Sequence, residues 1–312
     1  MRALVAARDR DDHIELRDVD DPTPGPHDAL VEVRAVSLNR GEVRSLAAAA
    51  DGWRPGWDVA GEVVARAADD SGPGVGERVV GLVAEGGWGE RVAVNTSVLV
   101  PIPDALSLPA ASTLPVAGLT AHCALRVGEV IDGSRILVTG AAGGVGRFAV
   151  QLAAHGGAKV TAIVGSRERG EGLAELGATD VVVGMPAEGV FDLILESVGG
   201  ASLATALTLL APGGTVVSFG NSSQEPTTFD VNTFRGSGGA TLYGLVLAHE
   251  LMKTGAAVRD LAYLAGLTAT GRLDPQISVT ANWAEAGAVA GALMDRQVKG
   301  KAVLLVNGEE DS

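Results

Sequence analysis

The 312-residue sequence contains one cysteine, two tyrosines and few other aromatic residues. Because Cys123 has no second cysteine to pair with, the chain can form neither an intramolecular disulfide nor a zinc site built from several cysteines. No apolar run is long enough to cross a bilayer, and the N-terminus becomes charged within its first ten residues, too early for a secretory signal. These absences predict a cytoplasmic protein without membrane contacts.

Basic residues are also scarce. The 24 lysines and arginines stand against 38 aspartates and glutamates, which gives a formal net charge of −14 at pH 7. Nucleic acids and anionic membranes are bound first through basic patches, so this balance predicts that neither is a partner. A small anionic cofactor needs positive charge only locally, and the charge balance does not argue against one.

The length of the chain suits two domains better than a single core. Short β-branched runs separated by Pro and Gly fill residues 1 to about 115, where we expect a partly open barrel and no helix of any length. Strand and helix signals then alternate up to residue 252, and the remaining tail is too short for a core of its own. We therefore predict an α/β protein with a β-rich domain, 1–116 completed by 253–312, and a doubly wound parallel-sheet domain, 117–252.

The stretch from Arg135 to Ala154 has the pattern of a strand, a glycine turn and a helix. Ala141-x-Gly143-x-x-Gly146 fits the dinucleotide-binding fingerprint, with alanine at the first glycine position. Gly143 would let a pyrophosphate approach the backbone, Gly144 and Val145 would begin the helix, and Gly146 would allow close packing of helix and strand. The alternative is a glycine turn that binds no ligand.

The next expected strand, Ala158 to Val164, ends without the acidic residue that typically binds the ribose 2′-hydroxyl of NAD. Ser166 and Arg167 follow instead, and a guanidinium can form paired hydrogen bonds with a phosphate. This favours NADPH as the cofactor. The alternative is that Arg167 and Arg169 are solvated residues in the first turn of a helix.

Further motifs occur in a fixed order along the chain: Val31–Asn39, Pro55–Gly61, Gly76–Val79, Leu114–Ala121, Leu176–Ala178, Glu196–Gly200 and Gly300–Leu304. Together with the glycine turn, they make the chain resemble the medium-chain dehydrogenase/reductase superfamily, and within it the zinc-independent quinone oxidoreductase branch. The resemblance implies a GroES-like catalytic domain, a Rossmann domain with sheet order 3-2-1-4-5-6, and nicotinamide bound in a cleft between them. It also implies a homodimer formed through the edge strand of the Rossmann sheet.

The resemblance further implies that no zinc is bound. Zinc-dependent relatives have a cysteine ligand where this chain has Asn39, and a Gly-His-Glu motif where it has Gly56-Trp57-Asp58. A catalytic zinc site needs three thiolate, imidazole or carboxylate ligands, which Asn39 and Trp57 cannot supply. The adjacent His122 and Cys123 face different sides of an expected helix and are interpreted as helix filling.

The resemblance also suggests site residues. Asn39 would contact the substrate or the nicotinamide ribose, unless it only forms a turn, and Thr120 would lie beside the nicotinamide, unless its hydroxyl bonds its own helix. Arg44 stands where several relatives have a tyrosine, and would either bind a carbonyl-bearing substrate or be solvated. The other cofactor-binding candidates follow expected parallel strands: Ser197, Gly199, Phe219, Gly220, Tyr243 and Leu245.

The leading hypothesis is a zinc-free, NADPH-dependent oxidoreductase that transfers hydride to a quinone or an activated enone. One alternative is an enoyl reductase acting on a polyketide-like biosynthetic intermediate, which the short alanine-rich segment after Arg44 would permit. Another is a protein that binds NADPH without turnover, as a sensor or structural component.

Overall fold

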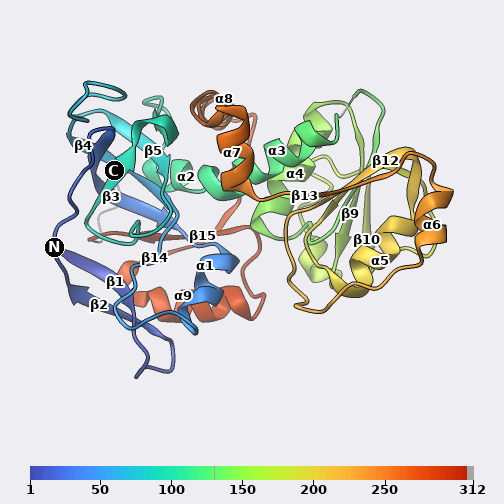
Figure 1. Ribbon diagram of the computed structural model, residues 1–312, viewed down its shortest axis with the longest axis horizontal. Coiled ribbons are helices and arrows are strands. Elements are labelled where there is room, and N and C mark those ends of the chain that lie inside the picture. The colour runs from blue at the N-terminus through green and yellow to red at the C-terminus, as the bar shows by residue number, and fades with distance from the viewer. Residues whose placement is uncertain (130, 308–312) are drawn as a thin grey trace. The chain divides into compact units, whose positions relative to one another are not determined.

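The computed structural model describes residues 1–129 and 131–307, which form two compact units (Figure 1). The first unit comprises Met1–Leu119 and the residues from Ala256 onward, and the second comprises Thr120–Gly255. The borders expected from the sequence, 116/117 and 252/253, lie a few residues before these, and residues 308–312 of the expected range lie outside the described residues.

The first unit is built around a seven-stranded sheet with the order β14-β15-β3-β4-β5-β7, in which β6 also pairs with β3. The strands of this sheet are β3 (Asp28–Ser37), β4 (Asp58–Ala65), β5 (Arg78–Leu82), β6 (Arg91–Asn95), β7 (Leu99–Pro101), β14 (Ile277–Asn282) and β15 (Lys301–Leu305). A separate antiparallel pair joins β1 (Arg2–Ala6) and β2 (Ile14–Asp18). Because β15 pairs antiparallel with β3, the end of the chain supplies a strand next to one formed near its beginning.

Strand β3 forms because apolar and polar residues alternate along it. Ala29, Val31 and Val33 are buried, whereas Leu30 and Glu32, which lie between them, are only half-buried. The alternation ends at Val36 and Ser37, which are both buried. The last residue of β3 therefore carries a hydroxyl into the interior of the first unit.

The first 115 residues contain helices, which corrects the expectation of none. Asn39 caps α1 (Arg40–Leu46), and its backbone N–H donates to Glu42 at the third helical position, a capping box that the alanine-rich sequence following it obscured. The other helical segments of the first unit are η1 (Thr96–Val98), α2 (Leu108–Ser112), η2 (Leu114–Gly118), α8 (Ala257–Ala269), η4 (Trp283–Glu285) and α9 (Ala286–Met294).

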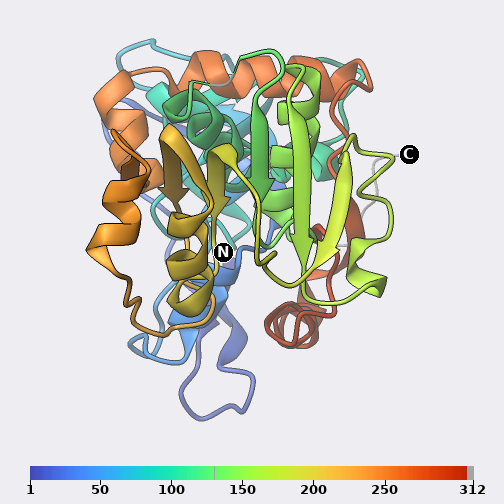
Figure 2. The ribbon, with the colours of Figure 1, turned by 90° about the vertical axis from the view of Figure 1, so that its right-hand side faces the viewer.

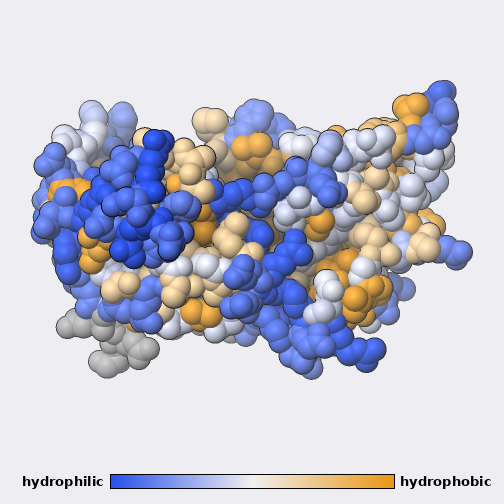
Figure 3. Space-filling view, turned by 90° about the horizontal axis from the view of Figure 1, so that it is seen from below, coloured by the Kyte–Doolittle hydropathy of each residue, from blue (hydrophilic) through white to orange (hydrophobic). Residues whose placement is uncertain are grey.

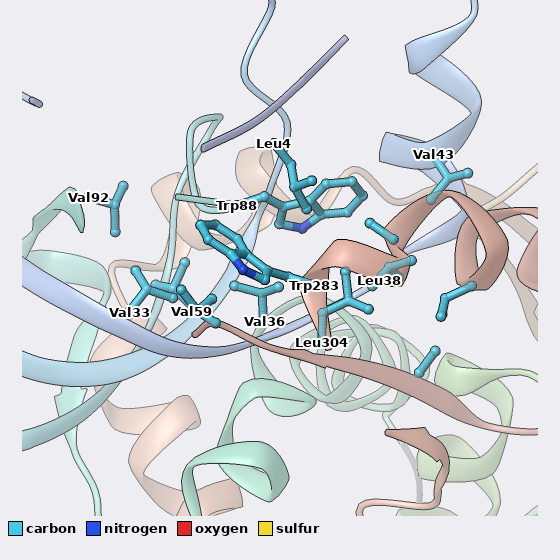
Figure 4. Packing of buried hydrophobic residues seen from close by; sticks show 14 of the residues in the cluster. Leu4, Val33, Val36, Leu38, Val43, Val59, Trp88, Val92, Trp283 and Leu304 are labelled. Carbon is cyan, nitrogen blue, oxygen red and sulfur yellow. The ribbon is translucent and has the colours of Figure 1, made fainter. Parts of the chain in front are cut away.

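The core of the first unit joins both ends of the chain. Figure 4 shows Trp88 and Trp283 among the side chains of Leu4, Val36 and Leu304. Both indoles are at most 2% exposed, and Leu304 is fully buried. Burial of these large apolar surfaces fixes β15 against the first strands of the chain.

The second unit contains a six-stranded sheet with the order β10-β9-β8-β11-β12-β13, in which all neighbouring strands are parallel (Figure 2). This confirms the expected doubly wound order 3-2-1-4-5-6. Its strands are β8 (Arg135–Val138), β9 (Lys159–Val164), β10 (Asp180–Val183), β11 (Phe191–Glu196), β12 (Leu210–Ser218) and β13 (Thr241–Gly244). Its helical segments are α3 (Leu119–Val127), α4 (Gly144–His155), η3 (Glu168–Gly170), α5 (Gly200–Thr208), α6 (Val231–Gly236) and α7 (Leu247–Thr254).

Hydrophobic and hydrophilic residues are mixed on the surface. The face in Figure 3 shows orange areas separated by blue ones. Within residues 1–129 and 131–307, each helix is too short or too polar to traverse a lipid bilayer.

Truncation of Leu304 tests the closure of the first unit by β15. Because Leu304 is fully buried, we expect Leu304→Ala to lower the free energy of unfolding by about 2–5 kcal/mol. All four tryptophans, Trp53, Trp57, Trp88 and Trp283, belong to this unit, so tryptophan fluorescence during urea unfolding reports on it. The control is Val64→Ala on β4, where the side chain is 39% exposed and a change of about 0.5 kcal/mol or less is expected. Equal losses in the two variants would contradict the packing described.

Candidate functional site

The glycine turn between β8 and α4 brings the first turn of a helix close to the end of a strand. Gly140 has a φ of +59°, a conformation that suits glycine, and Gly143 precedes α4 in an extended conformation. A Cβ on Gly146 would lie 2.4 Å from the carbonyl oxygen of Gly140, so this position accepts only glycine without rearrangement. The turn thus has the close approach that the fingerprint predicts.

The N-terminus of α4 is suited to bind an anion. The helix has twelve residues, and no side chain caps its start. Gly143, Gly144 and Val145 are half-buried, so they are partly accessible, whereas Ala141 is fully buried beneath the turn. First-turn N–H groups have no acceptor within their own helix and add to the positive end of its dipole, which favours a phosphate.

The turn after β11 is tied to the end of β8 through Thr139. The backbone N–H of Ser197 donates to Thr139 Oγ1 at 2.9 Å, and its hydroxyl donates to the Thr139 carbonyl at 3.2 Å. The fully buried Glu196 accepts hydrogen bonds from the backbone N–H groups of Val198 and Gly199, each at 3.0 Å. Thr139 and Glu196 therefore shape the strand ends, although sequence reasoning did not select them.

Gly220 lies against the same turn. A Cβ at this position would come within 2.9 Å of the Ser197 carbonyl oxygen, so the segment after β12 packs tightly on the segment after β11. Phe219 joins them, since its backbone N–H donates to the Glu196 carbonyl at 3.0 Å. The structure therefore brings Ser197, Phe219 and Gly220 together at the carboxyl ends of adjacent parallel strands.

At the end of β13, the hydroxyl of Tyr243 contacts α7. Tyr243 donates its hydroxyl hydrogen to Glu250 on α7 and accepts a hydrogen bond from Lys253 at 3.2 Å. The hydrogen bond from Tyr243 holds the pKa of the Glu250 carboxyl below its usual range. Leu245 lies just beyond β13, is 5% exposed, and its N–H donates to Ser218. The polar group of Tyr243 is thus engaged by α7.

Ser166 and Arg167 follow β9 as predicted from their place in the sequence. Arg167 is exposed and Ser166 half-buried, and Arg167 caps the single turn η3 rather than belonging to a longer helix. The buried Arg147, next to Gly146, donates to the Glu171 carbonyl at 2.8 Å. This contact links the segment that follows β9 to the first turn of α4.

A second group of polar residues is buried in the first unit. We call Ser37, Asn39, Glu42, Asp58 and Lys301 the ion cluster. Ser37, Glu42 and Asp58 are fully buried, and Lys301 is 2% exposed. Asn39, at the N-terminus of α1, is half-buried and is the most exposed member of the cluster.

Asp58 and Lys301 form the centre of the ion cluster. Asp58 Oδ2 accepts hydrogen bonds from the Ser37 hydroxyl at 2.6 Å and from Asn39 Nδ2 at 2.7 Å. Lys301 Nζ lies 3.5 Å from the same oxygen and donates to Asn39 Oδ1 at 2.8 Å. Buried charges are tolerated when they are paired and hydrogen-bonded in this way.

The cluster contains two carboxyl groups and one ammonium. Burial, followed by repulsion from Asp58, raises the pKa of Glu42 to about 8, although N–H donors from Asn39 and Trp57 favour its ionised form. Burial also lowers the pKa of Lys301, against the attraction of Asp58 and Glu42. A proton on Glu42 makes the cluster neutral, which is the state that a dry interior favours.

Two further predicted residues, Arg44 and Thr120, lie on helices. Arg44 is half-buried in the last turn of α1, and Thr120 is 6% exposed on α3. The ion cluster thus unites Asn39 with three residues that sequence reasoning did not assign to the site, Glu42, Asp58 and Ser37, and with Lys301. The capping box and the buried acid at the start of β4 were the available signals.

The ion cluster does not fit a zinc ion. An ammonium already lies among its oxygen atoms, and Asn39 offers a neutral amide in place of a thiolate or imidazole. In addition, the described part of the chain holds no group of three His, Cys, Asp or Glu side chains arranged to bind a metal. The ion cluster therefore offers no ligand set for zinc.

The first unit is β-rich and has a mixed sheet. The second has a parallel six-stranded sheet and a glycine turn. Together they define the class of two-domain dehydrogenase-like proteins. Family profiles agree: "Alcohol dehydrogenase GroES-like domain" matches residues 25–104 and "Zinc-binding dehydrogenase" matches residues 144–261. Prostaglandin reductase-3 of Mus musculus is 32% identical over 273 residues, covering 80% of this chain and 72% of that protein. The chain belongs to the medium-chain dehydrogenase/reductase superfamily, in its quinone oxidoreductase-like branch.

Other relatives are more partial. The chloroplastic quinone-oxidoreductase QR1 of Triphysaria versicolor is 38% identical over 177 residues, covering 52% of this chain and 54% of that protein. The polyketide synthase protein NorB of Streptomyces orinoci is 35% identical over 207 residues, covering 62% of this chain but 9% of that protein. Among solved structures, mycobacterial Rv1454c complexed with NADPH has a TM-score of 0.86 and 25% identity, covering 98% of this chain and all of that one. The chain thus spans about half the length of QR1 and a small part of NorB.

The protonation of Glu42 predicts how stability changes with pH. The pKa of Glu42 is higher in the folded protein than in the unfolded chain, so the folded state binds more protons between about pH 4.5 and 8 and loses stability as the pH rises. One proton corresponds to about 1.4 kcal/mol per pH unit. We expect Glu42→Gln to flatten this decline, measured by urea unfolding from pH 5 to 8 with tryptophan fluorescence.

The control for this experiment is Asp104→Asn, which removes an exposed carboxyl from the same unit. It should keep the wild-type dependence on pH. A Glu42→Gln variant whose stability changes with pH as steeply as the wild type would show that Glu42 is ionised throughout this range.

Proposed function

We propose that this oxidoreductase uses NADPH to reduce a quinone or an activated enone, without a catalytic zinc ion. The observation that carries the proposal is the close approach of Gly146 to Gly140, which leaves the first turn of α4 available to a pyrophosphate. The NADPH-complexed relative Rv1454c, which shares this fold, supports the choice of cofactor.

The second unit offers a residue for each phosphate group of NADPH. The N–H groups of Gly144, Val145 and Gly146 would bind the pyrophosphate, and Ser166 and Arg167 would bind the 2′-phosphate. The tight turns containing Ser197, Gly199, Phe219 and Gly220 would line the rest of the cofactor at the carboxyl ends of the strands. When bound, NADPH supplies a hydride from its nicotinamide ring.

The ion cluster limits what Asn39 can do for a substrate. Both Asn39 Nδ2 hydrogens have carboxyl partners, Asp58 at 2.7 Å and Glu42 at 3.2 Å, so the amide has no N–H left to polarise a carbonyl oxygen. Its oxygen can instead accept a hydrogen bond, for example from a hydroxyl of the nicotinamide ribose. Arg44 stays a candidate for the substrate carbonyl, Thr120 stays a candidate neighbour of the nicotinamide, and water would supply the proton that follows hydride transfer.

The substrate class draws on the relatives. QR1 is named a quinone oxidoreductase, and prostaglandin reductase-3 is named a reductase of prostaglandins. An electron-poor double bond or quinone accepts hydride directly and needs no metal if its oxygen is hydrogen-bonded. This supports a quinone or enone as the substrate of this chain.

A second candidate is an enoyl reductase acting on a polyketide-like intermediate. The similarity to NorB, a protein of a polyketide synthase system, favours it. The short connection between the end of α1 at Leu46 and the start of β4 at Asp58 is compatible with an elongated substrate. Binding of NADPH without turnover is the outcome in which both enzymatic proposals fail.

We also propose a homodimer formed through β13. This strand pairs only with β12 within the described sheet, and Leu242 on it is 41% exposed. Pairing with a second copy would cover an open row of backbone groups. A cytoplasmic location stays a prediction.

The choice of NADPH over NADH depends on the residues after β9. We expect the double replacement Ser166→Ala/Arg167→Ala to weaken NADPH binding by about tenfold or more, because charge-assisted hydrogen bonds to the 2′-phosphate are lost. NADH, which lacks this phosphate, should bind as before, and both affinities can be measured from the fluorescence of the reduced cofactor. The control is Arg169→Ala, two positions further along. Equal losses for NADPH and NADH would show that the 2′-phosphate is bound elsewhere.

The substrate proposal is tested with a panel of quinones, conjugated enones and enoyl thioesters under saturating NADPH. We expect NADPH oxidation with identified hydroquinone or saturated ketone as product. Turnover confined to enoyl thioesters would favour the second candidate. Saturable NADPH binding with no product from any member of the panel would refute both enzymatic proposals.

A further inference from the structure

The amide of Asn39 has its orientation fixed by partners that cannot exchange roles. Lys301 Nζ carries only donors, so the Asn39 atom 2.8 Å from it must be the oxygen. An ionised carboxylate carries only acceptors, so the Asn39 atom 2.7 Å from Asp58 must be the nitrogen. The two contacts act on opposite ends of one planar group, and a flipped amide would face like groups at both ends.

Lys301 has no hydrogen to spare for another partner. Its three N–H bonds match three acceptors: the Leu38 carbonyl at 3.2 Å, Asn39 Oδ1 at 2.8 Å and Asp58 Oδ2 at 3.5 Å. The residue is 2% exposed, so water does not compete for these positions. Lys301 therefore acts on Asn39, and its ammonium does not reach a ligand itself.

Asp58 is held equally firmly. One of its oxygens accepts from Ser37 and Asn39, and the other accepts the backbone N–H of Val116 at 2.8 Å. The partners of Asp58 thus come from the end of β3, the start of α1 and η2. The acceptor that faces Asn39 Nδ2 cannot rotate without breaking several hydrogen bonds.

We propose that Lys301 is a positioning residue that holds the Asn39 amide with its oxygen as the group offered to a ligand. The two amide hydrogens and one lone pair of the oxygen are used inside the protein, so one acceptor site is left. The ligand must therefore present a hydroxyl or N–H at this point, as a ribose hydroxyl or a carboxamide does, and a bare carbonyl oxygen is not recognised here. This inference rests on the proposed function only for the identity of the ligand.

Removal of the Lys301 ammonium should release the amide. In Lys301→Met, Asn39 Oδ1 loses its donor and two buried carboxyl groups lose their counter-charge. In the double variant Lys301→Met/Asp58→Asn the buried charge is reduced on both sides, which protects the fold while still removing the donor to Asn39. Asp58→Asn alone shows the effect of the altered Asp58 acceptor, and the further change in the double variant is due to Lys301. Lys301→Arg keeps a positive donor and should restore much of the effect. Lys299→Met, two residues earlier in the chain, serves as the matched control.

The first readout is the Asn39 side-chain amide in NMR spectra of protein labelled with [15N]asparagine. The chain contains six asparagines, and the Asn39 signal is identified by its loss in Asn39→Ala. Asp58→Asn adds a seventh asparagine signal, which is identified by its absence from the spectrum of Lys301→Met. We expect two separate, slowly exchanging Nδ2 hydrogens in the wild type and in Lys299→Met, and rapid exchange in Lys301→Met or the double variant. Rapid exchange in the wild type, or unchanged protection in a folded variant without Lys301, would overturn the proposal.

The second readout is the binding of NADPH, followed by fluorescence. If the Asn39 amide is flipped, its N–H group faces the hydroxyl or N–H of the ligand, and no hydrogen bond forms. Loss of Lys301 should therefore weaken NADPH binding by about tenfold, with partial recovery in Lys301→Arg. Wild-type affinity in a folded variant whose amide has lost its protection would show that Asn39 does not meet the cofactor. Neither readout needs turnover, so failure to find a substrate would refute the proposed reaction and leave this inference standing.

Discussion

The structure of the first unit depends on one buried ion pair, Lys301 with Asp58. The lysine enters on the last strand, β15, the aspartate opens β4, and their hydrogen bonds reach the end of β3 and the start of α1. A single charge so deeply buried would be costly, and even the pair requires that every remaining donor and acceptor be satisfied. This requirement explains why Ser37, Asn39 and Glu42, which are separate in the sequence, converge at one point.

In the second unit, backbone N–H groups form the candidate anion site at the start of α4. An anion bound at a helix N-terminus needs no charged side chain, but it needs the helix to begin very close to a strand end. Gly146 provides this closeness, and Thr139 and Glu196 fix the neighbouring turn through hydrogen bonds. The net charge of −14 is compatible with an anionic cofactor because local groups, the N–H groups at the start of α4 and the guanidinium of Arg167, would bind the phosphates, whatever the charge of the whole protein.

Sequence patterns predicted the parallel sheet well, because buried parallel strands are continuous apolar runs and the glycine turn has a fixed spacing. They failed for α1, since the capping box of Asn39 and Glu42 lies beside an alanine-rich segment with no apolar period. They also left open which atom of Asn39 a ligand would contact, because only the structure reveals that two carboxyl groups already accept both of its N–H bonds. Contacts such as Lys301 to Asn39 join residues far apart in the chain, and no local pattern encodes them.

Direct hydride transfer from NADPH to carbon, as proposed for this chain, can be followed by isotope labelling. NADPH deuterated at C4 of the nicotinamide, on one face at a time, is supplied with a conjugated enone, and the product is examined by mass spectrometry and NMR. We expect one deuterium at the β-carbon of the saturated ketone from one of the two labelled faces, and hydrogen from solvent at the α-carbon. Reduced product without deuterium from either face would contradict direct transfer.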